Sequence, residues 1–336
     1  MFAEASQAAA VVRAQLAAND DAVVALAGRL RANPPRLVTT LGRGSSDHAA
    51  TYARYLIETR LGVVTASAPP SVSSVYDQAP DLAGALCIAI SQSGQSPDLL
   101  AAAEASASAG ALVVAMVNET DSPLAALAQV VIPLRAGPER SVAATKSYIA
   151  ALAASAQLVA HWTGDEAMIA ALNDLPGALD RAWAEDWSAA LPVLQGAKNL
   201  YILGRGPGFG IAQEAALKFK ETCGLHAEAF SSAEVRHGPM ALVGPGFPIL
   251  AFVQDDETRE GIEAVARACA AQEAAVIKSG GGALPGVLDL PTGAIHPALQ
   301  PILQVQSFYR LAANLAVARG FDPDRPPHLN KVTETL

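Results

Sequence analysis

One pattern occurs twice in the chain, and the distance between its copies is the strongest constraint on the fold. The segments LVTTLGRGSSDHAATYARYL (37–56) and LYILGRGPGFGIAQEAALKF (200–219) each contain a β-rich run, the turn Leu-Gly-Arg-Gly and an Ala-rich helical pattern. The two turns lie 162 residues apart (204 minus 42), and the same offset carries the end of the apolar run 84–92 onto the end of the run 247–254. We therefore predict a tandem duplication of one α/β unit.

The alternation of short apolar runs with helical patterns predicts the fold class. Strands that alternate with helices form largely parallel sheets with helices on both faces. The predicted strands are residues 37–42, 84–92, 111–118 and 128–134 in the first half, and 199–204, 247–254, 274–279 and 286–291 in the second. The chain is thus expected to be an α/β protein made of two copies of a unit with a largely parallel sheet.

The predicted domain organisation follows from the two copies and from what separates them. Residues 1–165 form the first subdomain and residues 196–320 the second. A helical linker with several acidic residues is expected over 166–195, and an extended, proline-containing tail over 321–336.

Composition excludes several classes of partner. With 23 Lys and Arg against 32 Asp and Glu, the net charge is −9, which argues against nucleic acid because backbone phosphates require a basic face. Cys87, Cys223 and Cys269 are odd in number and form no CxxC pair, so neither a disulfide framework nor a zinc site is predicted. His226 and His237 also lack the HExxH zinc spacing.

The location predicted from the sequence is the cytoplasm, without a membrane span. Glu4 stands where a signal peptide carries positive charge. The most apolar later segment, Tyr148 to Trp162, is interrupted by Ser155 and Gln157 and is shorter than the roughly 20 residues of a bilayer span. We expect a buried core helix there.

The segment AISQSGQSPDLL (89–100) is a candidate anion-binding loop. In parallel sheets, ligands bind where strands end and helices begin. Ser96, Pro97 and Asp98 match N-cap, N1 and N2 of a helix, and Ser96 is predicted to accept a hydrogen bond from a free backbone N–H. The donors expected for a phosphate are hydroxyls, amides and backbone N–H groups; they come from Ser91, Gln92, Ser93 and Ser96.

An ordinary polar turn explains this loop equally well when the loop is considered alone. In the second copy, however, Gln254 is followed by Asp255-Asp256-Glu257, whose carboxylates repel a phosphate. We therefore predict one phosphate site per chain. A dinucleotide fingerprint is excluded because its third glycine is replaced by Asp47 in one copy and Phe209 in the other, and the chain contains no GxxxxGK[ST] motif.

A second candidate cluster follows the other Leu-Gly-Arg-Gly turn. Glu214, Lys218 and Glu221 are spaced i, i+4 and i+7, which places them within about 60° of one another on a helix. A solvated salt-bridged face is the simpler alternative. The position after the turn, followed by His226 and by His237 in sequence predicted as loop, favours proton transfer on a sugar phosphate.

These segments together resemble a known family. The motifs that carry the resemblance are the SQSGxS loop, SVAATK (141–146), ALKFKE (216–221), HAEA (226–229), EVRHGP (234–239) and LNK (329–331). In this order they resemble the tandem sugar isomerase (SIS) domains of glutamine:fructose-6-phosphate amidotransferase and its stand-alone relatives. The resemblance implies two doubly wound subdomains with parallel five-stranded sheets flanked by helices, a homodimer, a hexose 6-phosphate substrate and no cofactor.

The resemblance also implies residue roles. Glu221 moves a proton between C1 and C2, His237 of the neighbouring subunit opens the sugar ring, and Lys331 meets the sugar carbonyl as a Schiff base or as an electrostatic partner. The remaining implied residues bind phosphate (Ser46, Ser91, Gln92, Ser93 and Ser96), line the sugar (Val142 and Asn330) or support the site (Glu214 and Lys218).

One departure directs the choice of reaction. The amidotransferase has a glutaminase domain with a cysteine directly after the initiator Met, whereas here Phe2 follows Met1 and the first cysteine is Cys87. The expected activity is therefore deamination of glucosamine 6-phosphate to fructose 6-phosphate. Alternatives are galactosamine-6-phosphate deaminase, fructosamine-6-phosphate deglycase, ammonia-dependent synthesis of glucosamine 6-phosphate, and a non-catalytic sugar-phosphate sensor.

Overall fold

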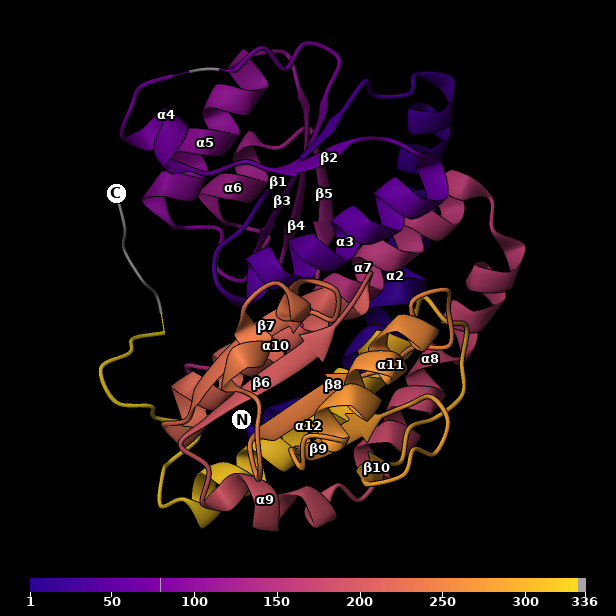
Figure 1. The fold of residues 1–336 in the computed structure, drawn as a ribbon. Coiled ribbons are helices and arrows are strands. Elements are labelled where there is room, and N and C mark those ends of the chain that lie inside the picture. Colours follow the sequence, from indigo (N-terminus) through magenta and orange to yellow (C-terminus); the bar gives the residue numbers. More distant parts are fainter. Residues whose placement is uncertain (79, 332–336) are drawn as a thin grey trace. The chain divides into compact units, whose positions relative to one another are not determined.

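Two compact units make up residues 1–78 and 80–331, which are the part of the chain that this computed structural model describes. Of the described residues, the N-terminal unit contains those within Ala10–Glu139 and Lys146–Asn173, together with Asn330 and Lys331. The C-terminal unit contains Met1–Ala9, Arg140–Thr145 and Asp174–Leu329. Each unit is organised around its own sheet (Figure 1).

The N-terminal unit has a five-stranded parallel sheet in the order β2-β1-β3-β4-β5. Every residue of β1 and β3 is buried, as expected when helices cover both faces of a parallel sheet. The strands are β1 (Val38–Leu41), β2 (Thr65–Ser67), β3 (Leu86–Ser91), β4 (Leu112–Val117) and β5 (Val130–Pro133). The helices are α2 (Ala8–Ala32), α3 (Ser45–Leu61), α4 (Ser71–Ser74), α5 (Pro97–Ser108), α6 (Pro123–Leu127) and α7 (Lys146–Thr163).

Small side chains let the helices of this unit approach the sheet closely. In one core cluster Cys87 and Ala89 of β3 meet Leu99 and Ala103 of α5, and all four are at most 2% exposed. Figure 1 shows α4, α5 and α6 on one side of this sheet and α3 and α7 on the other. Burial of a single leucine side chain contributes about 1.5–3 kcal/mol to the stability of the fold. Packing of this kind holds the strands in place, and with them the strand ends from which the loops emerge.

The C-terminal unit repeats this architecture with the strand order β7-β6-β8-β9-β10, again entirely parallel. Its strands are β6 (Asn199–Gly204), β7 (His226–Ser231), β8 (Pro248–Phe252), β9 (Ala275–Ser279) and β10 (Val287–Leu290). The helices are α1 (Phe2–Ala5), α9 (Leu191–Gln195), α10 (Gly208–Cys223), α11 (Arg259–Ala270) and α12 (Gln300–Ala318), with 3-10 turns η1 (Ser188–Ala190), η2 (Glu234–Arg236) and η3 (Pro239–Leu242). Helix α8 (Glu166–Ala184) contributes residues to both units, and so does α2, whose first two residues belong to the C-terminal unit.

The predicted duplication holds at the level of single elements. The 162-residue offset carries the bounds of α5, 97–108, onto 259–270, which are the bounds of α11. It also carries Gly62 onto Gly224, and both glycines end their helices in the left-handed conformation, with φ of 68° and 54°. The predicted α/β fold class with two parallel five-stranded sheets is confirmed.

Two strands, β2 and β7, were not predicted because neither contains an apolar run. Both β2 and β7 are edge strands, where one side of the strand is open, and their sequences TAS and HAEAFS are largely polar or exposed. His226 begins β7. The segment Tyr148 to Trp162 does form a buried core helix, within α7. Among the described residues, no helix is long and apolar enough to cross a membrane.

Candidate functional site

The strand order of the N-terminal unit marks one place where loops diverge. The chain passes from β1 outward to β2 and then returns to β3 on the other side of β1. The turn after β1 and the loop after β3 therefore leave neighbouring strands in opposite directions, which is where doubly wound sheets bind their ligands. Ser46 lies in the first turn of α3 after β1, and the SQSG segment follows β3.

The SQSG loop is held in a compact turn by its own residues. The hydroxyl of Ser91, which is 7% exposed, accepts a hydrogen bond from the Gly94 N–H at 2.9 Å. Gly94 has a φ of 64°, and a Cβ at this position would lie 2.2 Å from the Ser122 Oγ. The loop thus requires glycine for its conformation and for space, while Gln92 and Ser93 remain half-buried beside it.

The predicted position of Ser96 at the N-cap of α5 is correct, but the predicted hydrogen bond from its side chain is not formed. Ser96 is the N-cap of α5 and Pro97 is N1, but the Ser96 side chain makes no capping hydrogen bond. The reason is that Asp98 Oδ1 accepts from the Leu99 N–H at 2.8 Å, which is the N3 donor that an N-cap side chain would normally bind.

The matching loop of the C-terminal unit is filled by a side chain. Gln254 is fully buried, and its Nε2 donates to the Arg205 carbonyl oxygen at 2.6 Å and to the Thr258 Oγ1 at 2.9 Å. A Cβ added to Gly208 would lie 2.4 Å from the Gln254 Oε1. Asp256 in turn accepts from the N–H and the hydroxyl of Thr258. In the second copy, the side chains of Gln254, Asp256 and Thr258 thus hydrogen-bond with one another and with the backbone of this turn.

The cluster on α10 is buried, so the alternative of a solvated salt-bridged face is wrong for it. The Lys218 Nζ lies 2.5 Å from the Glu221 Oε2 and 3.3 Å from the Glu214 Oε1. Glu214 is fully buried and also accepts from the Tyr309 hydroxyl of α12 at 2.9 Å, whereas the Glu221 side chain is 18% exposed. Burial opposes the charge of Lys218, but the two carboxylates outweigh it and raise the pKa of the lysine.

This arrangement gives Glu221 the environment of a positioned base. Its carboxylate reaches solvent, and a buried ammonium fixes one of its oxygens. Such a group can take up and return a proton at a substrate carbon. His237 of the same unit is exposed at the end of η2 and precedes Gly238, whose φ is 124°.

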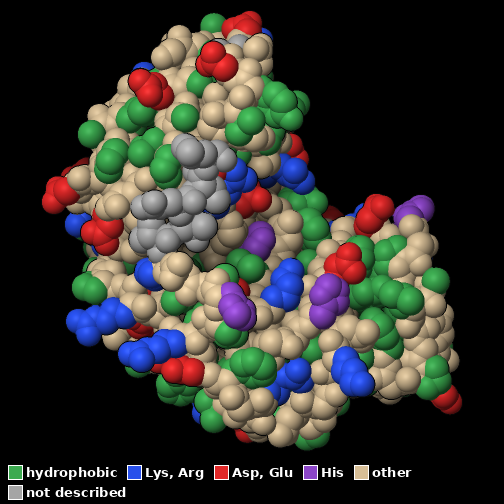
Figure 2. Space-filling view, turned by 90° about the vertical axis from the view of Figure 1, so that its left-hand side faces the viewer, with side chains coloured by type: hydrophobic (Ala, Val, Ile, Leu, Met, Phe, Trp, Pro, Cys, Tyr) green, Lys and Arg blue, Asp and Glu red, His purple; other side chains and the backbone are tan. Residues whose placement is uncertain are grey.

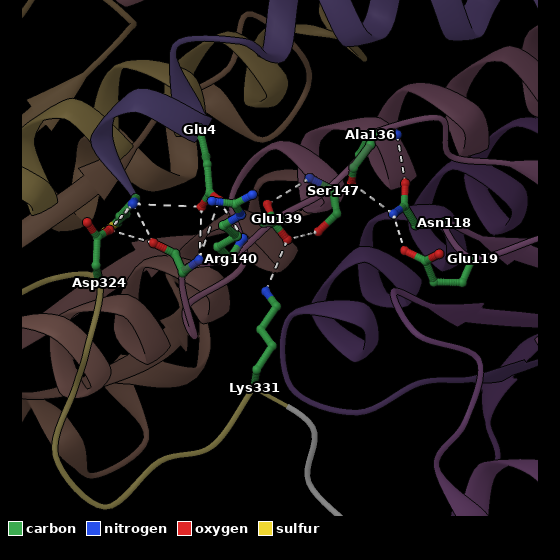
Figure 3. Close-up of polar contacts among 12 residues, drawn as sticks. Glu4, Asn118, Glu119, Ala136, Glu139, Arg140, Ser147, Asp324 and Lys331 are labelled. Carbon is green, nitrogen blue, oxygen red and sulfur yellow. Dashed lines mark hydrogen bonds and ion pairs between the residues drawn. The ribbon is translucent and has the colours of Figure 1, made fainter.

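Lys331 is held by a buried carboxylate that sequence reasoning missed. Its Nζ lies 3.5 Å from the Glu139 Oε2, and Glu139 is fully buried (Figure 3). Glu139 also accepts from the Ser147 N–H at 3.2 Å and from the Ser147 hydroxyl at 2.6 Å, at the N-terminus of α7. The carboxylate thus has helix donors on one side and the lysine on the other.

The structure divides the predicted site residues between the two units. Ser46, the SQSG loop, Asn330 and Lys331 belong to the N-terminal unit. Val142, Glu214, Lys218, Glu221 and His237 belong to the C-terminal unit. Val142 is half-buried and its N–H donates to the Asp324 carbonyl oxygen at 3.4 Å, whereas Asn330 is exposed.

Two missed residues, Glu139 and Tyr309, had no motif of their own. Glu139 lies two residues before the SVAATK segment, and Tyr309 lies within an apolar helix far along the chain. Their partners, Lys331 and Glu214, are 192 and 95 residues away (331 minus 139 and 309 minus 214). A single sequence contains no signal for such pairs.

Charges of both signs are interspersed on the face drawn in Figure 2, where histidine side chains also reach the surface. The net charge of −9 repels anions at long range. An anion site in a chain of this charge requires local donors. Among the described residues, no group of three or more His, Cys, Asp or Glu side chains is placed to hold a metal ion.

Comparison with protein families gives one match that extends over most of the chain. The family described as the SIS domain matches residues 34–161 and 193–278, one segment in each half. Glutamine–fructose-6-phosphate aminotransferase [isomerizing] of Aeropyrum pernix is 35% identical over 329 residues, which covers 93% of this chain and 53% of the relative. The chain thus spans about half the length of the curated relatives that it matches.

Solved structures show the same architecture over almost the whole chain. A protein from Silicibacter pomeroyi DSS-3, assigned provisionally as a phosphosugar isomerase, is 41% identical with a TM-score of 0.92, covering 96% of this chain and 99% of that one. The C-terminal domain of glucosamine-fructose-6-phosphate aminotransferase from Francisella tularensis is 25% identical with a TM-score of 0.87, covering 96% and 97%.

Proposed function

The chain belongs to the family of SIS-domain proteins, and from this membership we propose that it is a phosphosugar isomerase that deaminates glucosamine 6-phosphate. The observation that carries the proposal is the buried ammonium of Lys218 between Glu214 and Glu221. Two buried or partly buried carboxylates around one lysine are expensive to desolvate, and such groups concentrate at catalytic sites.

The phosphate of the substrate is assigned to the N-terminal unit. The donors are the hydroxyls and amides of Ser46, Ser91, Gln92, Ser93 and Ser96, together with backbone N–H groups at the start of α3 and α5. The filled loop around Gln254 supports one phosphate per chain, because its side chain already uses the corresponding space.

The proposed chemistry is an aldose-to-ketose proton transfer. His237 of a neighbouring subunit opens the ring, Glu221 takes a proton from C2 and returns it to C1, and Lys331 meets the carbonyl end of the open chain. O1 gains a proton as the amine loses one, and the resulting imine at C2 reacts with water to give fructose 6-phosphate and ammonia. Val142 and Asn330 line the sugar, and Glu214 and Lys218 hold Glu221 in place. The proposed assembly is a homodimer, and the proposed location is the cytoplasm.

Incubation of the full chain with glucosamine 6-phosphate tests the proposal through the release of ammonia and fructose 6-phosphate in equal amounts. Turnover of galactosamine 6-phosphate or of a fructosamine 6-phosphate instead would change the substrate, and formation of glucosamine 6-phosphate from fructose 6-phosphate and ammonia would change the preferred direction. Binding of these sugars without turnover of any would identify a sensor.

The role of Glu221 has its own test. We expect Glu221→Gln to lower kcat about 10²–10⁴-fold, because the amide cannot take the proton from C2. Inorganic phosphate, measured by calorimetry, should bind the variant as it binds the wild type. A parallel loss of phosphate binding would contradict the assigned role.

A further inference from the structure

Arg43 lies beside the proposed phosphate loop, where it contacts Asp98. It stands between Gly42 and Gly44 in the turn from β1 to α3. A Cβ at Gly42 would lie 2.8 Å from the Asp47 N, and Gly44 has a φ of 53°, so the backbone of this turn is tightly constrained. The direction in which the Arg43 side chain leaves the turn is therefore set by the fold.

The guanidinium of Arg43 is held by the carboxylate of Asp98, in the first turn of α5, the helix that follows the loop. Nε and Nη2 donate to the Asp98 Oδ2 at 2.9 and 2.5 Å. The Asp98 side chain is 1% exposed, whereas that of Arg43 is 53% exposed. Of the five N–H groups of a guanidinium, these contacts use two and leave three for another acceptor.

The negative charge of Asp98 is neutralised by the ion pair with Arg43. Asp98 is the second residue of α5, and a carboxylate there suits the helix dipole but repels a phosphate bound at the same helix end. Pairing with Arg43 cancels this charge, and the half-exposed edge of the guanidinium remains able to donate to phosphate oxygens.

The second copy supplies a natural comparison. The 162-residue offset carries Arg43 onto Arg205 and Asp98 onto Glu260. Within residues 1–78 and 80–331, no ion pair joins Arg205 to Glu260, and the Gln254 side chain occupies that turn. The arginine-carboxylate pair thus accompanies only the loop that is proposed to bind phosphate.

We propose that Arg43 is the cation of the phosphate site, held in place by Asp98 and donating directly to the phosphate of the substrate. This inference rests on the proposed function for the location of the phosphate. It adds a charged, bidentate donor to a loop that otherwise offers only neutral groups, and it makes Arg43 a determinant of affinity for phosphorylated over unphosphorylated sugars.

The first experiment measures binding of inorganic phosphate to the full chain by calorimetry. We expect Arg43→Gln to raise the dissociation constant about ten- to a hundredfold, because a charge-assisted donor is replaced by a neutral one. With glucosamine 6-phosphate, KM should rise by a similar factor while kcat changes by less than about threefold. Arg205→Gln is the matched control and should leave phosphate binding and KM unchanged.

A merely structural role for Arg43 predicts a different result in a double variant. If Arg43 only neutralises Asp98, then Arg43→Gln combined with Asp98→Asn removes both charges and should restore wild-type phosphate affinity. If Arg43 donates to phosphate, the double variant should still bind phosphate more weakly than the wild type, because the charged donor is missing even though the repulsion by Asp98 is gone. Asp98→Asn alone should retain phosphate binding, which also shows that the loop still folds.

The outcomes separate this inference from the proposed function. Unchanged phosphate affinity in Arg43→Gln, or full recovery in the double variant, overturns the inference even if glucosamine 6-phosphate is deaminated. Weak phosphate binding in both variants supports it even if no amino-sugar phosphate is turned over, because the calorimetric signal does not depend on catalysis.

Discussion

At the scale of single residues, Gly94 decides whether the proposed phosphate loop can form. Its φ of 64° favours glycine, and Ser122 fills the space into which a side chain would project. Gly62, at the end of α3, has a similar φ of 68° but no neighbouring heavy atom within 4 Å of an added Cβ. The two glycines therefore separate backbone strain from steric conflict.

We expect Gly94→Ala to cost about 1–3 kcal/mol more stability than Gly62→Ala, since only Gly94→Ala adds overpacking to the strain of a left-handed residue. Urea unfolding of both variants measures the difference. Inorganic phosphate should bind Gly62→Ala normally and Gly94→Ala poorly. Equal losses of stability in the two variants would show that the contact with Ser122 relaxes without cost.

At the scale of elements, α10 combines a core-packing role with the proposed catalytic one. It contacts α12 on one side, where Tyr309 bonds Glu214, and its last turns carry Lys218 and Glu221. One lysine therefore balances two carboxylates inside the packed helix layer.

Removal of this lysine should be costly. We expect Lys218→Met to destabilise the protein by about 3–5 kcal/mol, because Glu214 and Glu221 lose their counter-charge and Glu214 is fully buried. Lys220→Met is the control on the same helix; Lys220 is exposed, and its replacement should change stability by less than about 0.5 kcal/mol. Thermal unfolding followed by circular dichroism compares the two. A mild effect of Lys218→Met would mean that the carboxylates become protonated or hydrated instead.

At the scale of the whole molecule, one architecture occurs twice, and only one copy carries the loop that is proposed to bind phosphate. Helix bounds and strand order repeat at a constant offset, so both sheets present the same loop positions. The first copy leaves its loop to serine, glutamine and backbone donors, whereas Gln254 closes the second. The two copies therefore share the arrangement of strands and helices and differ in the side chains of the loops.

Both cores also bury thiols, which gives the molecule a predictable response to alkaline pH. Cys87 and Cys223 are fully buried, and burial raises the pKa of both thiols, that of Cys223 to about 11. Above the ordinary pKa of 9.0, the unfolded chain loses these protons while the folded chain keeps them. The linkage therefore favours unfolding as the pH rises from 9.0 toward 11.

We expect the free energy of unfolding of the wild type to fall relative to that of Cys223→Ala by about 1.4 kcal/mol per pH unit in this range. Urea titrations at several pH values measure the difference, and the two proteins should show parallel pH dependence below pH 8. A constant difference up to pH 11 would show that the Cys223 thiol ionises normally in the folded state.

The sequence by itself determined the duplication, the parallel α/β class, the candidate phosphate loop and the face shared by Glu214, Lys218 and Glu221, because these depend on periodicity and on local spacing. It missed β2 and β7, since edge strands need no apolar run. Only the tertiary structure decided that the α10 cluster is buried, that Asp98 takes the helix donor expected for Ser96, and that Glu139 holds Lys331. The Glu139–Lys331 contact joins segments that are far apart in the sequence, and Ser96 and Asp98 compete for one backbone N–H. Which contacts form, and which side chains are buried, depends on how the helices pack around the sheets.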